Sequence, residues 1–428
     1  MTGSSQGSTR SLLDRAGGPS RVRSIVDRLR GPLGDSRQPG GRHTLLAVCP
    51  ISKPIAQAAL RAAQEANAPL LYAATLNQVD RDGGYTDWTP SSFAAFVEQE
   101  TERLEIDIPV ILGLDHGGPW KKDAHVLQDL SYSETLAAVK RSLVACIEAG
   151  YELLHLDPTV DRRLPPHTPV PVDDIVTRTV ELLAFAEATR RDLGRGPIAY
   201  EVGTEEVGGG LQSEERFRTF LNRLDAALQS HDLPAPCFVV GDVGTTLDTA
   251  HFNRVRARRL TAEAEANLGA LLKGHYTDAV ADLSAYPLSG MGGANVGPGL
   301  SATKVRALQD LVQLEQNLDA DSHFSEALRT AVVDSDRWRK WLRPAEEGLP
   351  FDALSPDRQD WLIETGSRYV WSHPDVQAAR DTLYEHVAPY RDARAFVRWR
   401  IKTDVLRYVH AFNLIDFNDR LEEALANQ

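Results

Sequence analysis

The sequence of 428 residues is poor in cysteine, in basic charge and in long apolar runs. Its three cysteines, Cys49, Cys146 and Cys237, stand far apart in apolar stretches. They form neither a disulfide framework nor a zinc-finger spacing, so we expect core residues in a reducing, cytoplasmic compartment. With 47 basic and 60 acidic residues the net charge is −13, which argues against nucleic-acid binding. The sequence contains no run of about 18 apolar residues, so we expect no membrane span.

Residues 1–42 are rich in glycine, serine and arginine and lack the apolar core of a secretion signal. Within them Ile25 to Leu29 could form one short helix. We expect the remainder to be a flexible or weakly docked tail.

From residue 43 the chain repeats one unit, in which a short apolar strand leads through a polar or glycine-rich corner into an amphipathic helix. Eight such alternations predict a closed parallel TIM (β/α)8 barrel over residues 43–318. Residues 319–428 show no strand pattern and predict a helical C-terminal extension rich in Trp, Tyr and Arg. The expected strands are 44–48, 69–74, 108–114, 151–156, 197–202, 237–240, 268–273 and, with a weaker pattern, 294–296.

Polar side chains follow several of these strands. Asp115 and His116 come directly after the third strand, where a Gly-Gly-Pro corner begins. The carboxyl ends of the strands form the rim that carries catalytic residues in an α/β barrel. The other expected rim residues are Asn77, Gln78, Tyr85, His155, Asp157, Glu201, Glu205, Asp242, His275 and Asp278.

Two imidazoles and a carboxylate that meet at one point would suffice for a catalytic divalent-metal site. Such an ion can polarise a ketose carbonyl, while a second carboxylate moves a hydroxyl proton. The residues alone leave ligand and structural roles equally open for His116 and His275. His155 lies inside an apolar strand, where a satisfied core histidine is the commoner case. Glu205 could equally begin a solvated loop.

A phosphorylated substrate would need cationic or amide-rich anchors near the same rim. Lys273 alternates in phase with His275 and could therefore point the same way. Arg81 is a further cationic candidate. The glycine-rich residues 290–293 are another, because backbone amides in such a turn can cradle a phosphate.

These motifs, in this order, resemble the family of the accessory, non-catalytic subunit of class II D-tagatose-1,6-bisphosphate aldolase. The resemblance runs from about residue 43 to the C-terminus. That family is similar in turn to the metal-dependent class II aldolases, which are TIM barrels. The motifs are Asn77-Gln-Val, Gly83-Gly-Tyr-Thr86, Thr89-Pro-x-x-Phe93, Ile111-Leu-Gly-x-Asp-His116, His155-Leu-Asp157, Gly203-Thr-Glu205, His275-x-Thr-Asp278 and Val296-Gly-Pro-x-Leu300.

The resemblance implies roles for the rim residues. Asp115 and Glu201 would be catalytic, and His116, Glu205 and His275 would hold a divalent ion, with zinc favoured and manganese or nickel as alternatives. Asn77, Gln78, Tyr85, Asp157 and Gly297 would bind substrate together with Lys273. Where those aldolases place a further ligand histidine after strand six, this chain has Gly241-Asp-Val-Gly244. That departure suits a supporting subunit and also permits a variant site with a carboxylate in place of one imidazole.

Three functions follow as hypotheses. The chain could be a subunit that supports or takes part in the cleavage of tagatose bisphosphate to glycerone phosphate and glyceraldehyde 3-phosphate, in galactitol or tagatose catabolism. It could instead be a self-sufficient metal-dependent 4-epimerase of ketoses or ketose phosphates, such as fructose and tagatose, or an inactive sugar-phosphate-binding protein. The partners expected are a ketose or ketose phosphate, a class II aldolase catalytic subunit and further copies of this chain. The aromatic extension could be a docking surface or ordinary core.

Overall fold

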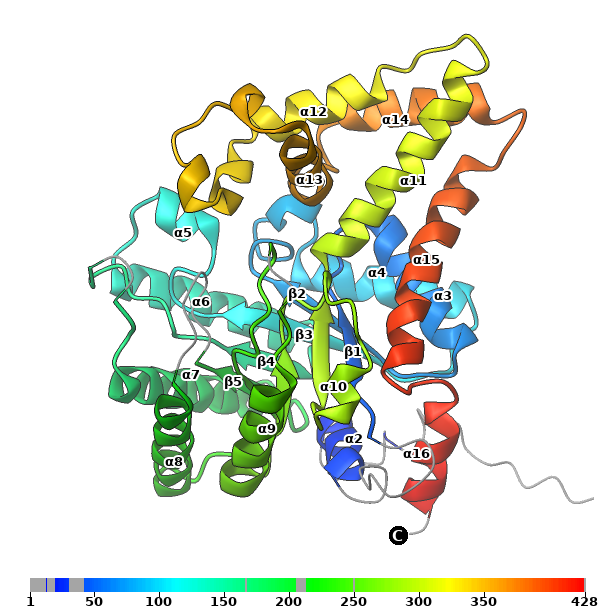
Figure 1. Ribbon diagram of the computed structural model, residues 1–428. Helices are drawn as coiled ribbons and strands as arrows, with labels where there is room; N and C mark the ends of the chain where they lie inside the picture. The colour runs from blue at the N-terminus through cyan, green and yellow to red at the C-terminus, as the bar shows by residue number, and fades with distance from the viewer. Residues whose placement is uncertain are drawn as a thin grey trace, which may run out of the picture.

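The computed structural model describes residues 13, 20–30, 42–165, 168–204, 213–248 and 251–426. Eight parallel strands form a closed barrel in which each strand pairs with the next and β8 pairs with β1 (Figure 1). The predicted TIM-barrel fold is therefore confirmed. The strands are β1 (Leu45–Val48), β2 (Leu70–Thr75), β3 (Val110–Gly117), β4 (Leu153–Leu156), β5 (Ala199–Gly203), β6 (Phe238–Val240), β7 (Leu271–Gly274) and β8 (Gly293–Val296).

Helices on the outside of the barrel begin where local capping chemistry allows it. Thr89 caps α4 and Ser131 caps α6, each through a reciprocal capping box with the residue three positions on. The helices that follow the strands are α3 (Lys53–Glu65), α4 (Pro90–Arg103), α5 (Asp123–Leu127), α6 (Tyr132–Glu148), α7 (Val172–Asp192), α8 (Glu214–Ser230), α9 (Arg254–Leu268), α10 (Ala285–Leu288) and α11 (Pro298–Gln316), with the short 3₁₀ turn η2 (Gly84–Thr86) after β2.

The C-terminal extension is helical throughout its regular elements. Figure 1 shows α12, α13 and α14 gathered beyond one end of the barrel, while α15 returns along α11 and α3. At the opposite end α16 lies beside α2 (Arg21–Arg30). The elements are α12 (Phe324–Asp334), η3 (Arg337–Trp341), η4 (Pro344–Glu346), η5 (Phe351–Ala353), α13 (Pro356–Gly366), η6 (Ser367–Tyr369), α14 (Pro374–Val387), α15 (Ala393–Ala411) and α16 (Phe417–Ala426).

Most of the apolar and aromatic side chains expected in the core are buried. The three cysteines are buried and unpaired, as predicted. Trp338 and Trp371 are buried within the extension, whereas Trp399 is 55% exposed. Trp338 and Trp371 are therefore core residues and not part of a docking surface. Among the helices of the described residues, none is long and apolar enough to cross a bilayer.

The short helix expected around Ile25–Leu29 is present as α2, and it covers the amino end of the barrel. Its buried face consists of Val22, Ile25, Val26 and Leu29. Arg21 Nε donates a hydrogen bond of 2.7 Å to Glu152 Oε2, directly before β4. Apolar burial and this ion pair together hold α2 against the barrel.

We predict that Ile25→Ala lowers the free energy of unfolding by about 2–5 kcal/mol, because a fully buried branched side chain leaves a cavity when it is truncated. Asp27→Ala is the matched control on the exposed face of the same helix and should change it by less than about 0.5 kcal/mol. Urea unfolding followed by circular dichroism measures both values. Equal effects of the two changes would show that α2 is not packed as described.

Candidate active site

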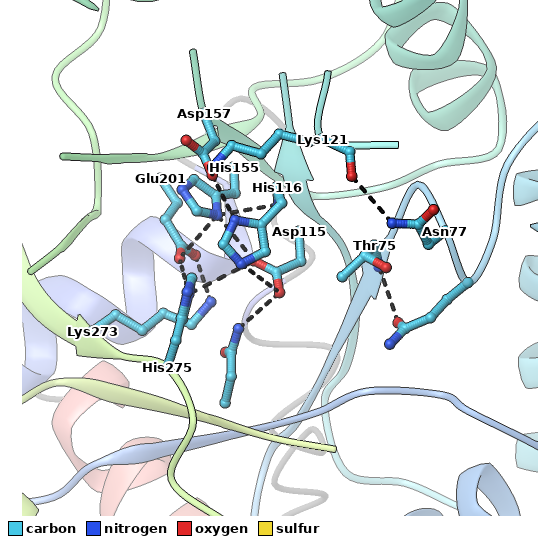
Figure 2. Close-up of polar contacts among 12 residues, drawn as sticks. Thr75, Asn77, Asp115, His116, Lys121, His155, Asp157, Glu201, Lys273 and His275 are labelled. Atoms are coloured by element: carbon cyan, nitrogen blue, oxygen red, sulfur yellow. Dashed lines mark hydrogen bonds and ion pairs between the residues drawn. The ribbon is translucent and has the colours of Figure 1, made fainter. Parts of the chain in front are cut away.

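Acidic and imidazole side chains from four strands meet at the carboxyl end of the barrel (Figure 2). Nδ1 of His155 lies 2.9 Å from Asp115 Oδ1 and 3.6 Å from Glu201 Oε1. Nε2 of His275 lies 3.4 Å from the same Glu201 oxygen and 3.7 Å from Asp115 Oδ1. One ligand atom from each of the four residues lies within 4.8 Å of all the others.

A break in strand regularity brings Asp115 and His116 to the same place. Successive side chains on a strand normally point to opposite faces. Here the register of β3 against β4 shifts between Leu114 and Gly117, and His116 has a φ of +51°, in the left-handed region. Gly118 permits the turn, since a Cβ there would stand 1.7 Å from the Asp157 carbonyl oxygen. The irregularity re-aims one side chain, as β-bulges near active sites do.

The parallel register places the deeper residues. His155 on β4 stands directly beside Glu201 on β5. Lys273 on β7 and His275, the residue that directly follows this strand, are two residues apart and both reach Glu201. Lys273 Nζ lies 2.5 Å from Oε2, and His275 Nε2 lies 3.4 Å from Oε1. The predicted phase of Lys273 with His275 is therefore correct.

The four residues fit a divalent ion by distance and chemistry. Around a tetrahedral ion with bonds of about 2.0–2.1 Å, neighbouring ligand atoms stand about 3.3 Å apart. Three of the separations in the cluster, 3.4, 3.6 and 3.7 Å, are close to this value, and the fourth, 2.9 Å, is shorter. Imidazole nitrogen and carboxylate oxygen are ligands suited to zinc and its neighbours. These buried side chains could therefore hold a metal ion.

Charge balance also favours a cation at this point. Burial opposes ionisation of Asp115, but the three surrounding imidazoles outweigh it and hold the pKa well below its usual value. Burial likewise raises the pKa of Glu201, but Lys273 and the imidazoles lower it to about 2. The two buried carboxylates, Asp115 and Glu201, thus lie beside a single ammonium group, that of Lys273. One negative charge remains, and a metal ion or a protonated imidazole could neutralise it.

A second polar group surrounds His116. Its Nδ1 lies 2.5 Å from Asp157 Oδ2, and Lys121 Nζ lies 2.7 Å from the same oxygen. Burial opposes ionisation of Asp157, but Lys121 and His116 hold its pKa well below the usual value. His116, His155 and Asp157 also form a possible ligand group. The ring centroids of His116 and His275 are 4.7 Å apart, although the two residues fall into different groups.

A cavity of about 170 Å³ opens above the cluster. Asp115, His116 and His275 line it, whereas Glu201 and His155 are fully buried and lie outside its lining. The C-terminal extension supplies part of the wall, which the sequence patterns did not indicate. The contributing extension residues are Lys340, Trp341, Arg368 and Tyr369.

The substrate positions expected from the resemblance fall partly on this cavity. Asn77, Gln78, Tyr85 and Gly297 line it. Gln78 Oε1 accepts a hydrogen bond of 3.0 Å from the Thr75 amide, and the Gly297 amide donates one of 2.7 Å to Asp278 Oδ1. Asn77 holds the loop before α5, because its Oδ1 accepts from the Asp123 amide at 2.8 Å. These internal bonds occupy groups that a substrate would otherwise use.

Other expected residues lie elsewhere. Glu205 is outside the described residues. Asp242 is in neither possible ligand group of the described residues, and its Oδ1 accepts from the Gly244 amide at 2.7 Å. The phosphate cradle expected at residues 290–293 is wrong, because these residues lead into β8 at the amino end of the barrel. Conversely, the pattern reading favoured a core role for His155, and the structure puts it inside the cluster.

Comparison with known proteins bears on the family. Residues 33–233 match the family model described as GatZ_KbaZ-like, D-tagatose-1,6-bisphosphate aldolase subunit GatZ/KbaZ-like. The resemblance to this family is confirmed. A relative from Escherichia coli O17:K52:H18 (strain UMN026), named D-tagatose-1,6-bisphosphate aldolase subunit GatZ, is 27% identical over 81% of this chain and 86% of its own length. A relative of the same name from Shigella boydii serotype 18 gives the same values.

Solved structures support the fold. A protein from Sinorhizobium meliloti 1021, described as a probable tagatose 6 phosphate kinase, has a TM-score of 0.68 at 24% identity and covers 86% of this chain and 100% of its own. The fructose-bisphosphate aldolase of Campylobacter jejuni has a TM-score of 0.52 at 11% identity, covering 92% of this chain and 95% of its own. At these identities the likeness concerns architecture alone.

We predict that the protein binds one divalent ion per chain through the cluster that includes His275. His275→Ala should lose the ion on dialysis, because a coordinating nitrogen is removed. Asp157→Asn should weaken binding by no more than about 10- to 100-fold, the effect typical of a partner outside the ligand set. Elemental analysis and competition with a chromogenic chelator measure both. Loss with Asp157→Asn and retention with His275→Ala would instead assign the ion to the group around His116.

Proposed function

We propose that this chain is a subunit of a D-tagatose-1,6-bisphosphate aldolase. It would bind a divalent metal ion and a ketose phosphate and take part in aldol cleavage. The observation that carries the proposal is the convergence of Asp115, His155, Glu201 and His275 at the carboxyl end of the barrel, beneath a cavity. The relatives that match this chain over most of their length are named as aldolase subunits. Their names support the choice of sugar and the expectation of a catalytic partner chain.

In this proposal His155, Glu201 and His275 would hold the ion, and its chemistry when bound would be to polarise the keto group of the sugar. Zinc is favoured, with manganese or nickel as alternatives. Glu201 serves better as a ligand than as a proton carrier, because its second oxygen is fixed by Lys273 at 2.5 Å and it lies outside the cavity lining. Lys273 is accordingly a partner of Glu201 and not a substrate anchor.

Asp115 is the proposed proton carrier, because it is the carboxylate of the cluster that faces the cavity. Asn295 Nδ2 donates to its Oδ2 at 3.0 Å and orients it. Asp115 would accept the proton of the hydroxyl at C4. The electrons of the bond between C3 and C4 would then pass toward the keto group, which releases the aldehyde fragment. Return of a proton to C3 completes the cleavage.

A second candidate is a self-sufficient ketose-phosphate 4-epimerase. The observation that favours it is that a single chain supplies the whole ligand cluster and also forms part of the cavity wall with its own extension. The same deprotonation and bond cleavage, followed by rotation of the aldehyde and re-addition, would invert C4. A supporting subunit would need neither the cluster nor the cavity.

We predict that the protein alone, supplied with Zn²⁺, Mn²⁺ or Ni²⁺, interconverts D-fructose 6-phosphate and D-tagatose 6-phosphate if it is an epimerase. If it is a subunit, it should instead raise tagatose-bisphosphate cleavage by a class II catalytic chain. Coupled assays and chromatography of the sugars measure both reactions. Absence of both activities would leave only a binding role and would end the proposal.

In whichever assay is positive, Asp115→Asn should lower kcat by about 100- to 10,000-fold while metal content stays the same, because a proton carrier is lost. Asp129→Asn, at an exposed position whose partner Arg162 lies 3.2 Å away, is the control and should leave kcat unchanged. Full activity in Asp115→Asn would remove this residue from the mechanism.

A further inference from the structure

Arg368 is a buried cation at the wall of the cavity. It lies on η6 of the extension, is 4% exposed and lines the cavity together with Trp341 and Tyr369. Its guanidinium carbon stands 4.9 Å from the Trp341 ring centroid and 4.5 Å from that of Tyr369. Nη2 donates to the Tyr369 hydroxyl at 2.9 Å, and Nη1 donates to the Thr365 carbonyl. Two aromatic rings and two hydrogen bonds thus fix the plane of the guanidinium.

Within the part of the chain that the structure describes, no carboxylate oxygen comes within 4.0 Å of this guanidinium. The other two cations of the cavity lining differ in this respect. Lys121 Nζ lies 2.7 Å from Asp157, and Lys340 Nζ lies 2.6 Å from Asp123. Arg368 is therefore the one of these three side chains that makes no ion pair within the described residues.

Asp278 is a further carboxyl group on the same cavity, and it does not supply the missing partner. Its Oδ1 accepts hydrogen bonds from the amides of Gly297 at 2.7 Å and Gly299 at 2.8 Å. Burial raises its pKa, although these amide hydrogen bonds and the positive charge of Arg368 oppose the rise. Asp278 is therefore hydrogen-bonded by the backbone and makes no ion pair with Arg368, which attracts it only at longer range.

A buried charge without a partner is costly, and buried arginines are normally paired. A guanidinium is always charged, and its planar fork matches the oxygens of a phosphate group, which it can bind through two parallel hydrogen bonds. A cation held in a fixed plane at a cavity wall is therefore suited to an anionic group of a ligand that enters the cavity.

We propose that Arg368, carried by the C-terminal extension, binds the phosphate group of the ketose phosphate. The identity of the sugar rests on the function proposed above, whereas the role of Arg368 can be tested by binding alone. The extension is then part of the substrate site and supplies specificity for phosphorylated over free sugars.

Arg358 provides a matched control. It is 6% exposed and stacks on Trp361 at 4.3 Å, so its burial and its aromatic contact are similar to those of Arg368. It differs in being paired with Glu346 at 3.0 Å and Asp248 at 3.2 Å. It also lies outside the cavity lining.

Calorimetric titration of the metal-loaded protein with D-fructose 6-phosphate and with D-fructose tests the proposal. Arg368→Met should weaken binding of the phosphorylated sugar about 10- to 100-fold and leave binding of free fructose unchanged. Arg368→Lys should recover part of the loss, and Arg358→Met should change neither affinity. Undiminished binding of D-fructose 6-phosphate by Arg368→Met, or equal losses for both sugars, would overturn the proposal.

Thermal unfolding without ligand separates anchoring from a structural role. Arg358→Met should lower Tm, because it removes the buried ion pairs that Arg358 makes with Glu346 and Asp248. Arg368→Met should keep or raise Tm, since it removes a buried charge that has no ion-pair partner among the described residues. A loss of Tm in Arg368→Met as large as in Arg358→Met would show a structural arginine and contradict the proposal. Failure of sugar conversion with phosphate-dependent binding intact would count against the proposed function and not against Arg368.

Discussion

Two carboxylates, on Asp115 and Glu201, are buried at the mouth of the barrel, and the surrounding arrangement follows from what keeps them charged. Moving an ionised carboxyl group out of water costs about several kcal/mol unless charges or hydrogen bonds replace the solvent. Here the replacements come from separate strands and their ends: His155 from β4, Lys273 from β7 with His275 directly after it, and Asn295 from β8. No local segment could assemble them, so the closed parallel sheet is a condition for the site and not only its support.

The irregular end of β3 shows how the fold meets this demand. A regular strand would point one of Asp115 and His116 away from the barrel. The register shift and the positive φ of His116 let both side chains face inward, and a residue in this conformation is normally held by its surroundings. The contact of His116 with Asp157, and of Asp157 with Lys121, supplies that restraint. The second polar group therefore has a structural reason to exist whether or not it ever holds an ion.

The sequence was sufficient to predict the barrel and most residues at its rim, because strand patterns, capping boxes and polar residues after strands are local signals. It was not sufficient to predict which side chains contact one another. His155 looked like a core histidine because its neighbours are apolar, which is true of its strand but not of the adjacent β5, where Glu201 stands beside it. Lys273 was oriented correctly yet assigned to substrate, since the sequence does not show that Glu201 reaches it. Arg368 carried no signal, because its relation to the cavity depends on contacts between residues far apart in the chain.

The extension changes how the choice between subunit and enzyme should be argued. Its residues are tied to the barrel loops: Lys340 pairs with Asp123 beside α5, and the rings of Tyr369 and Tyr85 meet at 5.2 Å in a T-shaped contact. A supporting subunit would be expected to leave its mouth open or to offer it to a partner chain. This chain instead lines part of its mouth with aromatic and cationic side chains of its own extension. Any ligand that enters the cavity therefore meets side chains of the extension as well as those of the barrel rim.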